Sequence, residues 1–338
     1  MRVIDLHCDT IYKILERRKR GEAISLREND LMIDLIKLKK GGYSVQNFAL
    51  YVEQKAGESS FLKGKELLSV FKEEISKNGD LISQVYTTKD ILKNEKVGKL
   101  SALLTVEEGG VCEGKLKNLY FLYKAGVRMM TLTWNFPNEI GYPNFNKEGD
   151  FYKPNKEDGL TKIGIEFVQE MERLGMIVDV SHLSDAGFYD VLKYTKAPFV
   201  ASHSNARAVC PVVRNLTDDM VIKLAKRGGV IGLNYSVDFL RDHPGREKVD
   251  GKNPKNWGGG YASLEDIAEH AKHIANIGGI ECVGLGSDFD GIPPHPELSS
   301  ADAVPQLAQT MAAKGFSESE IDKILYKNVF RLYREILG

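Results

Sequence analysis

Cysteine is scarce in this sequence, and none of its four cysteines lies in a CxxC pair. Because Cys8, Cys112, Cys210 and Cys282 are widely separated, we expect free thiols and a reducing compartment rather than a disulfide framework. No apolar run approaches membrane-spanning length, and the opening MRVIDLHCD carries acidic residues where a signal peptide needs an apolar core. We therefore predict a cytoplasmic protein without a membrane partner.

Neither sign of charge dominates, with 46 lysines and arginines against 47 aspartates and glutamates, so no nucleic-acid partner is expected. The GxSxG motif of a serine-hydrolase nucleophile elbow is also missing. No repeat, low-complexity run or linker marks a domain boundary, so we predict that residues 1–338 form a single domain.

Eight short apolar stretches alternate with helical patterns along the chain. Most are continuous apolar runs, which are typical of parallel strands covered on both faces. They cover residues 3–8, 43–52, 100–106, 128–133, 176–180, 199–202, 230–234 and 282–286. Among the helical patterns, residues 161–174 place Phe167 and Met171 on one apolar stripe, and Gly175 is available as the C-cap. This alternation predicts an α/β fold, a (β/α)8 TIM-like barrel.

Extra length falls in two segments rich in glycine, proline, asparagine and charge. Residues 135–156 follow the fourth predicted strand, and residues 238–260 follow the seventh. We interpret both as loop insertions, either solvated or covering a substrate. Both follow the carboxyl ends of strands, where barrel enzymes build their sites.

Two neighbouring predicted strands end in Ser-His, at His182 and at His203. The segment between them is helical in character, with Ser184 as a candidate N-cap. A strand–helix–strand unit makes the two strands parallel, so both imidazoles should emerge side by side at one edge of the sheet. Local hydrogen bonding would explain either histidine alone. The pair at equivalent strand ends favours a metal site.

Other strand ends supply carboxylates. The first ends in HCD, with His7 and Asp9 facing the same way, the third in TVEEGG and the eighth in GSDFDG, which contains Asp288. Such a set is costly to bury without metal, whereas divalent cations would make it a binuclear site. The fourth strand offers no lysine for carbamylation, so Glu107 or Glu108 should bridge the ions. Alternation along a strand lets only one of them face the barrel axis.

The segments DGLTKIGIEFVQEMERLGMIVDVSHLSD, ASHSNARAVCPVVRN and GLGSDFDG, together with HCD and EEGG in the same order, resemble the membrane dipeptidase (renal dipeptidase) family of zinc peptidases. The likeness covers nearly the whole chain. It implies a metal-dependent hydrolase barrel that binds two Zn²⁺ per subunit, cleaves dipeptides and forms a homodimer, although no interface signal is visible. It also implies that His7 and Asp9 bind one zinc, that His182 and His203 bind the other, and that Glu108, before Gly-Gly, bridges them.

The same resemblance implies that Asp288 is the acid/base residue and that Arg214 binds the substrate carboxylate. The net charge of such a metal site also suits hydrolysis. Two Zn²⁺ with two carboxylates and a metal-bridging hydroxide leave about one positive charge, which favours a developing oxyanion.

One position departs from the family. TLTWNFPN places Trp134 where animal members carry a substrate-contacting histidine, and an indole can donate a hydrogen bond but cannot carry a proton charge.

Three hypotheses follow. The first is a zinc dipeptidase acting on dipeptides with a free C-terminal carboxylate. The second, motivated by Trp134, keeps the binuclear site but changes the substrate to another small amide or a lactam. The third is a non-catalytic metal- or peptide-binding barrel, against which the intact Asp288 argues. Metal analysis coupled to a substrate panel separates the three.

Overall fold

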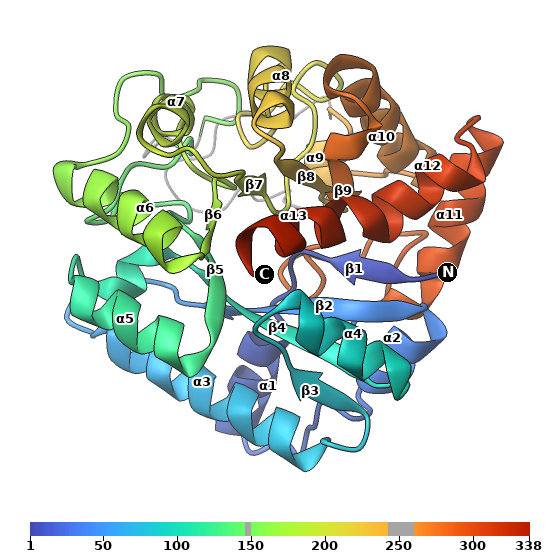
Figure 1. Cartoon of the computed structure of the whole chain (residues 1–338), viewed down its shortest axis with the longest axis horizontal. Coiled ribbons are helices and arrows are strands. Elements are labelled where there is room, and N and C mark those ends of the chain that lie inside the picture. The colour runs from blue at the N-terminus through green and yellow to red at the C-terminus, as the bar shows by residue number, and fades with distance from the viewer. Residues whose placement is uncertain (146–149, 243–259) are drawn as a thin grey trace.

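A computed structural model describes residues 1–145, 150–242 and 260–338, and within these residues eight parallel strands close into a barrel surrounded by helices (Figure 1). The strands are β1 (Val3–Asp5), β2 (Tyr43–Tyr51), β4 (Leu100–Glu107), β5 (Val127–Thr131), β6 (Ile177–Asp179), β7 (Val200–Ala201), β8 (Val230–Leu233) and β9 (Val283–Leu285). β1 pairs with β2 and β9, and the pairing of β2 with β4 closes the ring. The predicted (β/α)8 barrel is confirmed.

A ninth strand, β3 (Ile82–Gln84), was not predicted. It pairs with Leu100–Ala102 of β4, outside the closed ring. The strand has three residues, of which only Ile82 is buried, so it carries neither an apolar run nor a clear alternation.

Side-chain caps mark the starts of several helices. Thr161 accepts a hydrogen bond from the Gly164 N–H at the start of α6 (Lys162–Leu174), and Gly175 ends that helix with φ 69°. The other helices are α1 (Thr10–Lys19), α2 (Leu35–Lys40), α3 (Ser60–Lys77), α4 (Thr88–Lys96), α5 (Leu116–Ala125), α7 (Asp185–Tyr194), α8 (Asp218–Lys226), α9 (Val237–Leu240), α10 (Leu264–Gly278), α11 (Val304–Ala313), α12 (Glu318–Asp322) and α13 (Asn328–Ile336). Ser184 is the N-cap of α7, as predicted.

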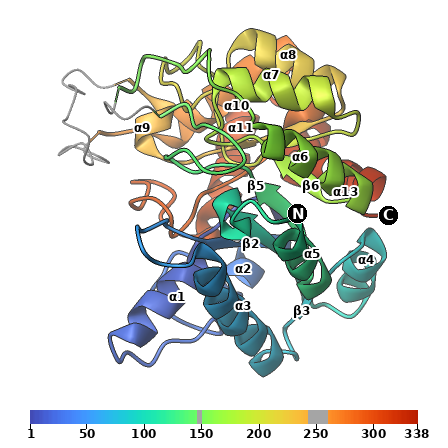
Figure 2. The same ribbon diagram turned by 90° about the vertical axis from the view of Figure 1, so that its left-hand side faces the viewer.

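One mouth of the barrel is filled by α13, which crosses the strands in Figure 1. Apolar side chains from seven barrel strands meet Val329, Leu332 and Tyr333 of α13 in one buried cluster. The Tyr333 hydroxyl donates to Asn47 Oδ1 of β2 over 2.7 Å. In Figure 2, α13 and α9 lie on opposite sides of the molecule. A ligand site inside the barrel must therefore open at the other mouth, where the strands end.

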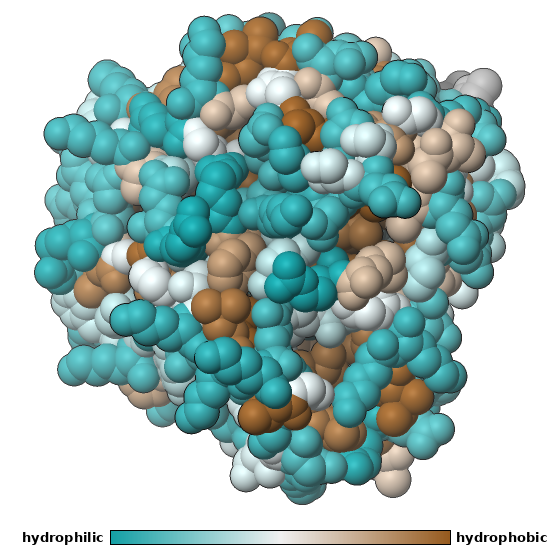
Figure 3. Space-filling view, turned by 45° about the vertical axis from the view of Figure 1, so that its right-hand side comes forward, coloured by the Kyte–Doolittle hydropathy of each residue, from teal (hydrophilic) through white to brown (hydrophobic). Residues whose placement is uncertain are grey.

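The outer faces of the strands pack against the helices in a second, larger core. The face shown in Figure 3 is mostly hydrophilic, with hydrophobic residues in separate small groups. No helix in the described ranges combines the length and the apolarity that crossing a bilayer requires.

The first predicted insertion, residues 135–156, contains no helix or strand in its described part, and isolated bridges join its Gly141 to Leu160 and its Pro143 to Leu183. The second predicted insertion, residues 238–260, differs at its start, because α9 continues to Leu240. Residues 146–149 and 243–259 lie outside the described residues.

Candidate active site

Side chains from five strand ends converge at the open mouth of the barrel. They are His7 and Asp9 after β1, Glu107 at the end of β4, His182 after β6, His203 after β7 and Asp288 after β9. His7 Nε2 lies 3.4 Å from Asp9 Oδ2, 3.4 Å from Glu107 Oε2 and 3.8 Å from Asp288 Oδ1. These separations are those of ligand atoms gathered around a shared point.

Glu107 lies between two groups of ligand atoms. Its Oε2 faces His7, while its Oε1 lies 3.1 Å from His182 Nε2 and 3.4 Å from His203 Nε2. The two Nε2 atoms of His182 and His203 are themselves 3.0 Å apart. A carboxylate in this position can contact two cations at once, one through each oxygen.

Glu108, the expected bridging residue, lies outside this group. Its Oε2 accepts a hydrogen bond from the backbone N–H of Trp134 at 2.7 Å, and its Oε1 accepts from the backbone N–H of Gly110 at 2.7 Å and from the Asn138 side-chain amide. A Cβ at Gly110 would lie 1.7 Å from the Gln54 amide nitrogen and 2.5 Å from Glu108 Oε1, so a side chain there would displace both groups. Glu108 therefore holds the Gly-Gly turn against the loop after β5. Our assignment of the bridge moves to Glu107.

The alternation of side chains along β4 explains why Glu107, rather than Glu108, faces the potential metal ligands. Leu103 packs in the cluster inside the barrel, whereas Leu104 and Val106 pack in the outer core. With a period of two, Glu107 continues the inner set and Glu108 the outer set. Glu108 then departs from the strand with φ 89°.

All six side chains at the mouth are buried, and burial is the largest cause of the pKa shifts of four of them. It raises the pKa of Glu107 to about 8 and that of Asp288 to about 6. It also holds the pKa values of His182 and His203 well below the usual range for histidine. Burial alone would lower the pKa of His7, but the carboxylates of Glu107 and Asp9 outweigh it and raise that pKa.

The residues present fit divalent metal ions. Both ring nitrogens of His7 and Oδ1 of Asp9 are buried and have no hydrogen-bond partner in the described part of the chain. Buried polar atoms are normally paired, and both residues belong to the same cluster of potential metal ligands as Glu107. Three imidazoles with carboxylates form a donor set that zinc accepts readily.

The two histidines of the Ser-His pairs are oriented through their second nitrogens. His203 Nδ1 lies 2.7 Å from Ser202 Oγ, and that hydroxyl donates to Asp179 Oδ2 over 2.6 Å. Ser202 Oγ therefore accepts from His203 Nδ1–H. His182 Nδ1 lies 2.8 Å from Asn135 Oδ1, an acceptor, so it too carries the proton. Both Nε2 atoms are left as ligands, the arrangement common in metal-binding histidines.

Two buried aspartates join neighbouring strand ends at the site. Asp179 Oδ1 accepts from the Ser202 N–H at 2.8 Å, which ties β6 to β7. Asp5 Oδ1 accepts from the N–H groups of His7 and Ser287 at 3.1 Å and 3.0 Å, which ties β1 to β9. Neither residue was predicted from the sequence. A lone aspartate inside an otherwise apolar strand was the available signal.

Backbone strain accompanies two of the converging side chains. His182 and Asp288 have φ values of 67° and 62°, in the left-handed region. Such a conformation costs a non-glycine residue about 1–2 kcal/mol. Strained residues of this kind cluster at functional sites. The turn in the backbone brings both side chains back over the mouth.

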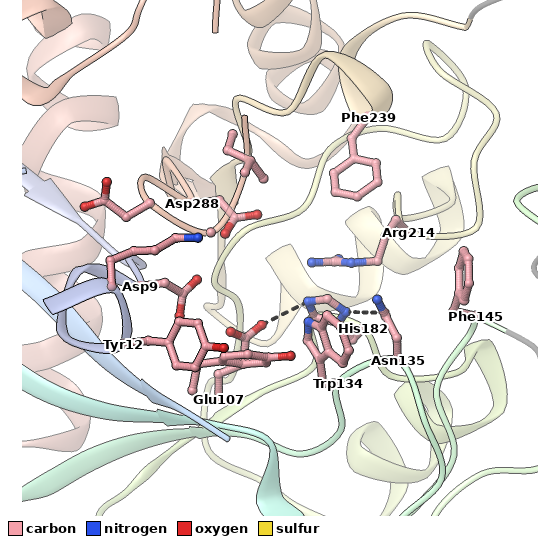
Figure 4. Close-up of a pocket in the computed structure, with 15 residues that line it drawn as sticks. Asp9, Tyr12, Glu107, Trp134, Asn135, Phe145, His182, Arg214, Phe239 and Asp288 are labelled. Carbon is pink, nitrogen blue, oxygen red and sulfur yellow. Dashed lines mark hydrogen bonds and ion pairs between the residues drawn. The ribbon is translucent and has the colours of Figure 1, made fainter. Parts of the chain in front are cut away.

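The mouth opens into a cavity of about 320 Å³ (Figure 4). The predicted carboxylate-binding residue, Arg214, is buried in its wall and donates to Ser204 Oγ and to the His203 carbonyl oxygen. Its guanidinium carbon lies 5.3 Å from the centre of the Phe239 ring, and its Nε has no partner among the described residues. Burial lowers the pKa of Arg214 to about 10, so it remains a cation at neutral pH.

Trp134 also lines the cavity, with its ring centre 5.2 Å from that of Tyr51 and 6.1 Å from that of His182. Elsewhere in the lining, Asp288 receives a hydrogen bond on Oδ2 from the Asn234 amide at 2.9 Å. Asn234 was not singled out from the sequence, because an asparagine at a strand end has no distinctive signature.

Some other side chains of types that bind metals have structural partners. Cys8 is buried, and its thiol donates a hydrogen bond to the Asn47 carbonyl. His270 accepts the Ala206 N–H and contacts the Leu240 carbonyl with its second nitrogen. His295 accepts backbone N–H groups in its own loop. His243 lies outside the described residues.

Comparisons with known proteins place this geometry in context. Residues 1–337 match the family model described as membrane dipeptidase, peptidase family M19. An uncharacterized dipeptidase of Schizosaccharomyces pombe is 31% identical over 351 residues, covering 99% of this chain and 80% of that protein. A solved dipeptidase described as a metallopeptidase of family M19 has a TM-score of 0.87 at 27% identity, covering 100% of this chain and 99% of that one. A metallopeptidase from Rhodobacter sphaeroides, liganded with a phosphinate mimic of the dipeptide L-Ala-D-Ala, has a TM-score of 0.84 at 26% identity over 99% of each chain.

Proposed function

Because this chain belongs to the membrane dipeptidase family (peptidase family M19) and is therefore a metallopeptidase acting on dipeptides, we propose that it uses two zinc ions to hydrolyse dipeptides with a free C-terminal carboxylate. The position of Glu107 supports the binuclear site most directly, since its two oxygens face His7 and His182 separately. His7 and Asp9 would hold one ion, His182 and His203 the other, and Glu107 both.

When bound, two zinc ions would supply Lewis acidity, lowering the pKa of an attacking water and polarising the peptide carbonyl. Asp288 is the proton carrier in this proposal. Its Oδ2 is occupied by Asn234, and its Oδ1 is directed toward His7. Asp288 Oδ1 would take a proton from the water as the new C–O bond forms, and would return it to the amine nitrogen as the C–N bond breaks.

Arg214 would bind the substrate's C-terminal carboxylate. A guanidinium matches a carboxylate with parallel hydrogen bonds, and this one is buried, cationic and on the cavity wall. Phe145 and Phe239 lie on the same side of the cavity (Figure 4), so they would contact the C-terminal side chain. The small cavity and the fixed cation together favour substrates of two residues.

Metal analysis combined with a substrate panel tests this function. We expect roughly two zinc ions per chain, loss of dipeptide hydrolysis on exhaustive chelation, and recovery when zinc is added back. Full activity in thoroughly chelated enzyme would contradict the proposal.

A second candidate keeps the same site and replaces the dipeptide by another small amide or a lactam. It is favoured by Trp134, which offers the cavity an indole in place of an ionisable imidazole. The panel should therefore include N-acyl amino acids and lactams. We also propose a cytoplasmic location and a homodimer. The four free cysteines support the cytoplasmic location.

A further inference from the structure

The proposed mechanism leaves one cation of the cavity without a role. Lys13, on the first turns of α1, lines the cavity beside Tyr12 and Ile292. Its side chain is exposed, and its Nζ has no hydrogen bond and no carboxylate within 4.0 Å among the described residues. Among the described residues of the lining, the other lysine or arginine is Arg214, which the proposed function already assigns to the substrate carboxylate.

The acidic groups that line the cavity together with Lys13 have other partners. Asp290 accepts hydrogen bonds from Thr10 Oγ1 at 2.6 Å and from the Met32 N–H at 2.8 Å. Asp9 belongs to the metal-binding cluster, and Asp288 is held by Asn234. Lys13 is thus a cation at the cavity rim that can accept an anionic partner from solution.

Neighbouring arginines do not share this property. Lys13 also lines an adjoining surface hollow together with Arg17 and Arg20. Arg17 forms ion pairs with Glu22 and Asp30, and Arg20 pairs with Glu22 at 3.0 Å. Among the described residues of this hollow, Lys13 is therefore the cation without an ion pair, and it also lines the cavity.

The direction of a bound dipeptide decides what Lys13 would meet, and here the inference rests on the proposed function. With the substrate carboxylate at Arg214, the scissile bond would lie over Glu107 and His182. Figure 4 shows Asp9 and Tyr12 across the cavity from Arg214. The amino-terminal residue would then extend toward α1, with its side chain against Tyr12, Ile292 and Lys13.

We propose that Lys13 forms an anion-binding subsite for the side chain of the amino-terminal residue, so that dipeptides beginning with aspartate or glutamate are preferred. The Tyr12 ring, whose centre lies 5.1 Å from that of Tyr51, gives the methylene part of that side chain an apolar wall. Lysine suits this task because its ammonium is a mobile point charge on a long stem. Since the pair is partly exposed, we expect a preference of about five-fold.

The test compares matched substrates on the zinc-loaded, full-length enzyme. In the wild type, kcat/KM for Glu-Ala should exceed that for Gln-Ala about five-fold, and the ratio should shrink as salt is raised. Lys13→Met should bring the ratio close to one, and Lys13→Glu should invert it. Lys19→Met is the matched control, because Lys19 lies on the same helix but pairs with Glu66. Its ratio should equal that of the wild type.

The possible outcomes distinguish the Lys13 subsite from the dipeptidase activity on which it depends. Equal cleavage of Glu-Ala and Gln-Ala by the wild type, or a preference that survives Lys13→Met, would overturn the subsite while Ala-Ala hydrolysis still upheld the dipeptidase. A preference seen only between Ala-Glu and Ala-Gln would place the anion at the other end and also overturn it. Failure to cleave any dipeptide would overturn both.

Discussion

Replacing Glu107 by glutamine removes one negative charge from the centre of the site while keeping the side-chain shape. Glu107 is within 3.4 Å of three imidazole nitrogens, and its two oxygens face different histidines. Losing even an outer partner of a metal ligand costs roughly 10–100-fold in metal affinity. We therefore expect Glu107→Gln to lower zinc affinity by at least about 100-fold, with a matching loss of activity.

The same substitution should have the opposite effect on the metal-free protein. Burial raises the pKa of Glu107 from 4.5 to about 8, which corresponds to roughly 5 kcal/mol against the ionised form. The folded state thus binds this proton more tightly than the unfolded state. Stability from this group is present at low pH and is lost as pH rises from about 4.5 to about 8. Metal-free Glu107→Gln should therefore be more stable than the metal-free wild type near pH 8.

Zinc competition titrations and urea unfolding at pH 5 and pH 8 measure the two effects. Glu108→Gln is the matched control, since Glu108 accepts backbone hydrogen bonds beside the site and lies outside the ligand cluster. It should keep wild-type zinc stoichiometry and lose about 1–3 kcal/mol of stability. Normal zinc affinity in Glu107→Gln, or zinc loss in Glu108→Gln instead, would refute the assignment of Glu107 as the bridge.

Three further substitutions test other parts of the site. Ser202→Ala removes the hydroxyl that orients His203 and should weaken zinc binding about 10–100-fold, measured by chelator competition. Asp288→Asn should retain zinc by metal analysis but lower kcat by about 10²–10⁴-fold, and near-normal kcat would exclude it as the proton carrier. Arg214→Ala should chiefly raise KM for dipeptides in steady-state assays, and an unchanged KM would count against the carboxylate clamp.

Local patterns in the sequence determined the elements and most of the residues that meet. Apolar runs marked the eight barrel strands, and the candidate N-cap Ser184 marked the start of α7. Because parallel strands end at one edge of a sheet, the adjacency of His182 and His203 follows from the order of the elements alone. The short strand β3 carried no such pattern and was missed.

Only the closed barrel decided which way each side chain faces. A strand covered on both faces is apolar at successive positions, as Leu103 and Leu104 are, so its sequence has no phase and cannot separate Glu107 from Glu108. The left-handed turn at His182 and the buried contacts of Asp179 likewise depend on neighbours distant in sequence. Sequence periodicity specifies where a strand runs, whereas the face that points to the axis is set by what packs on its two sides.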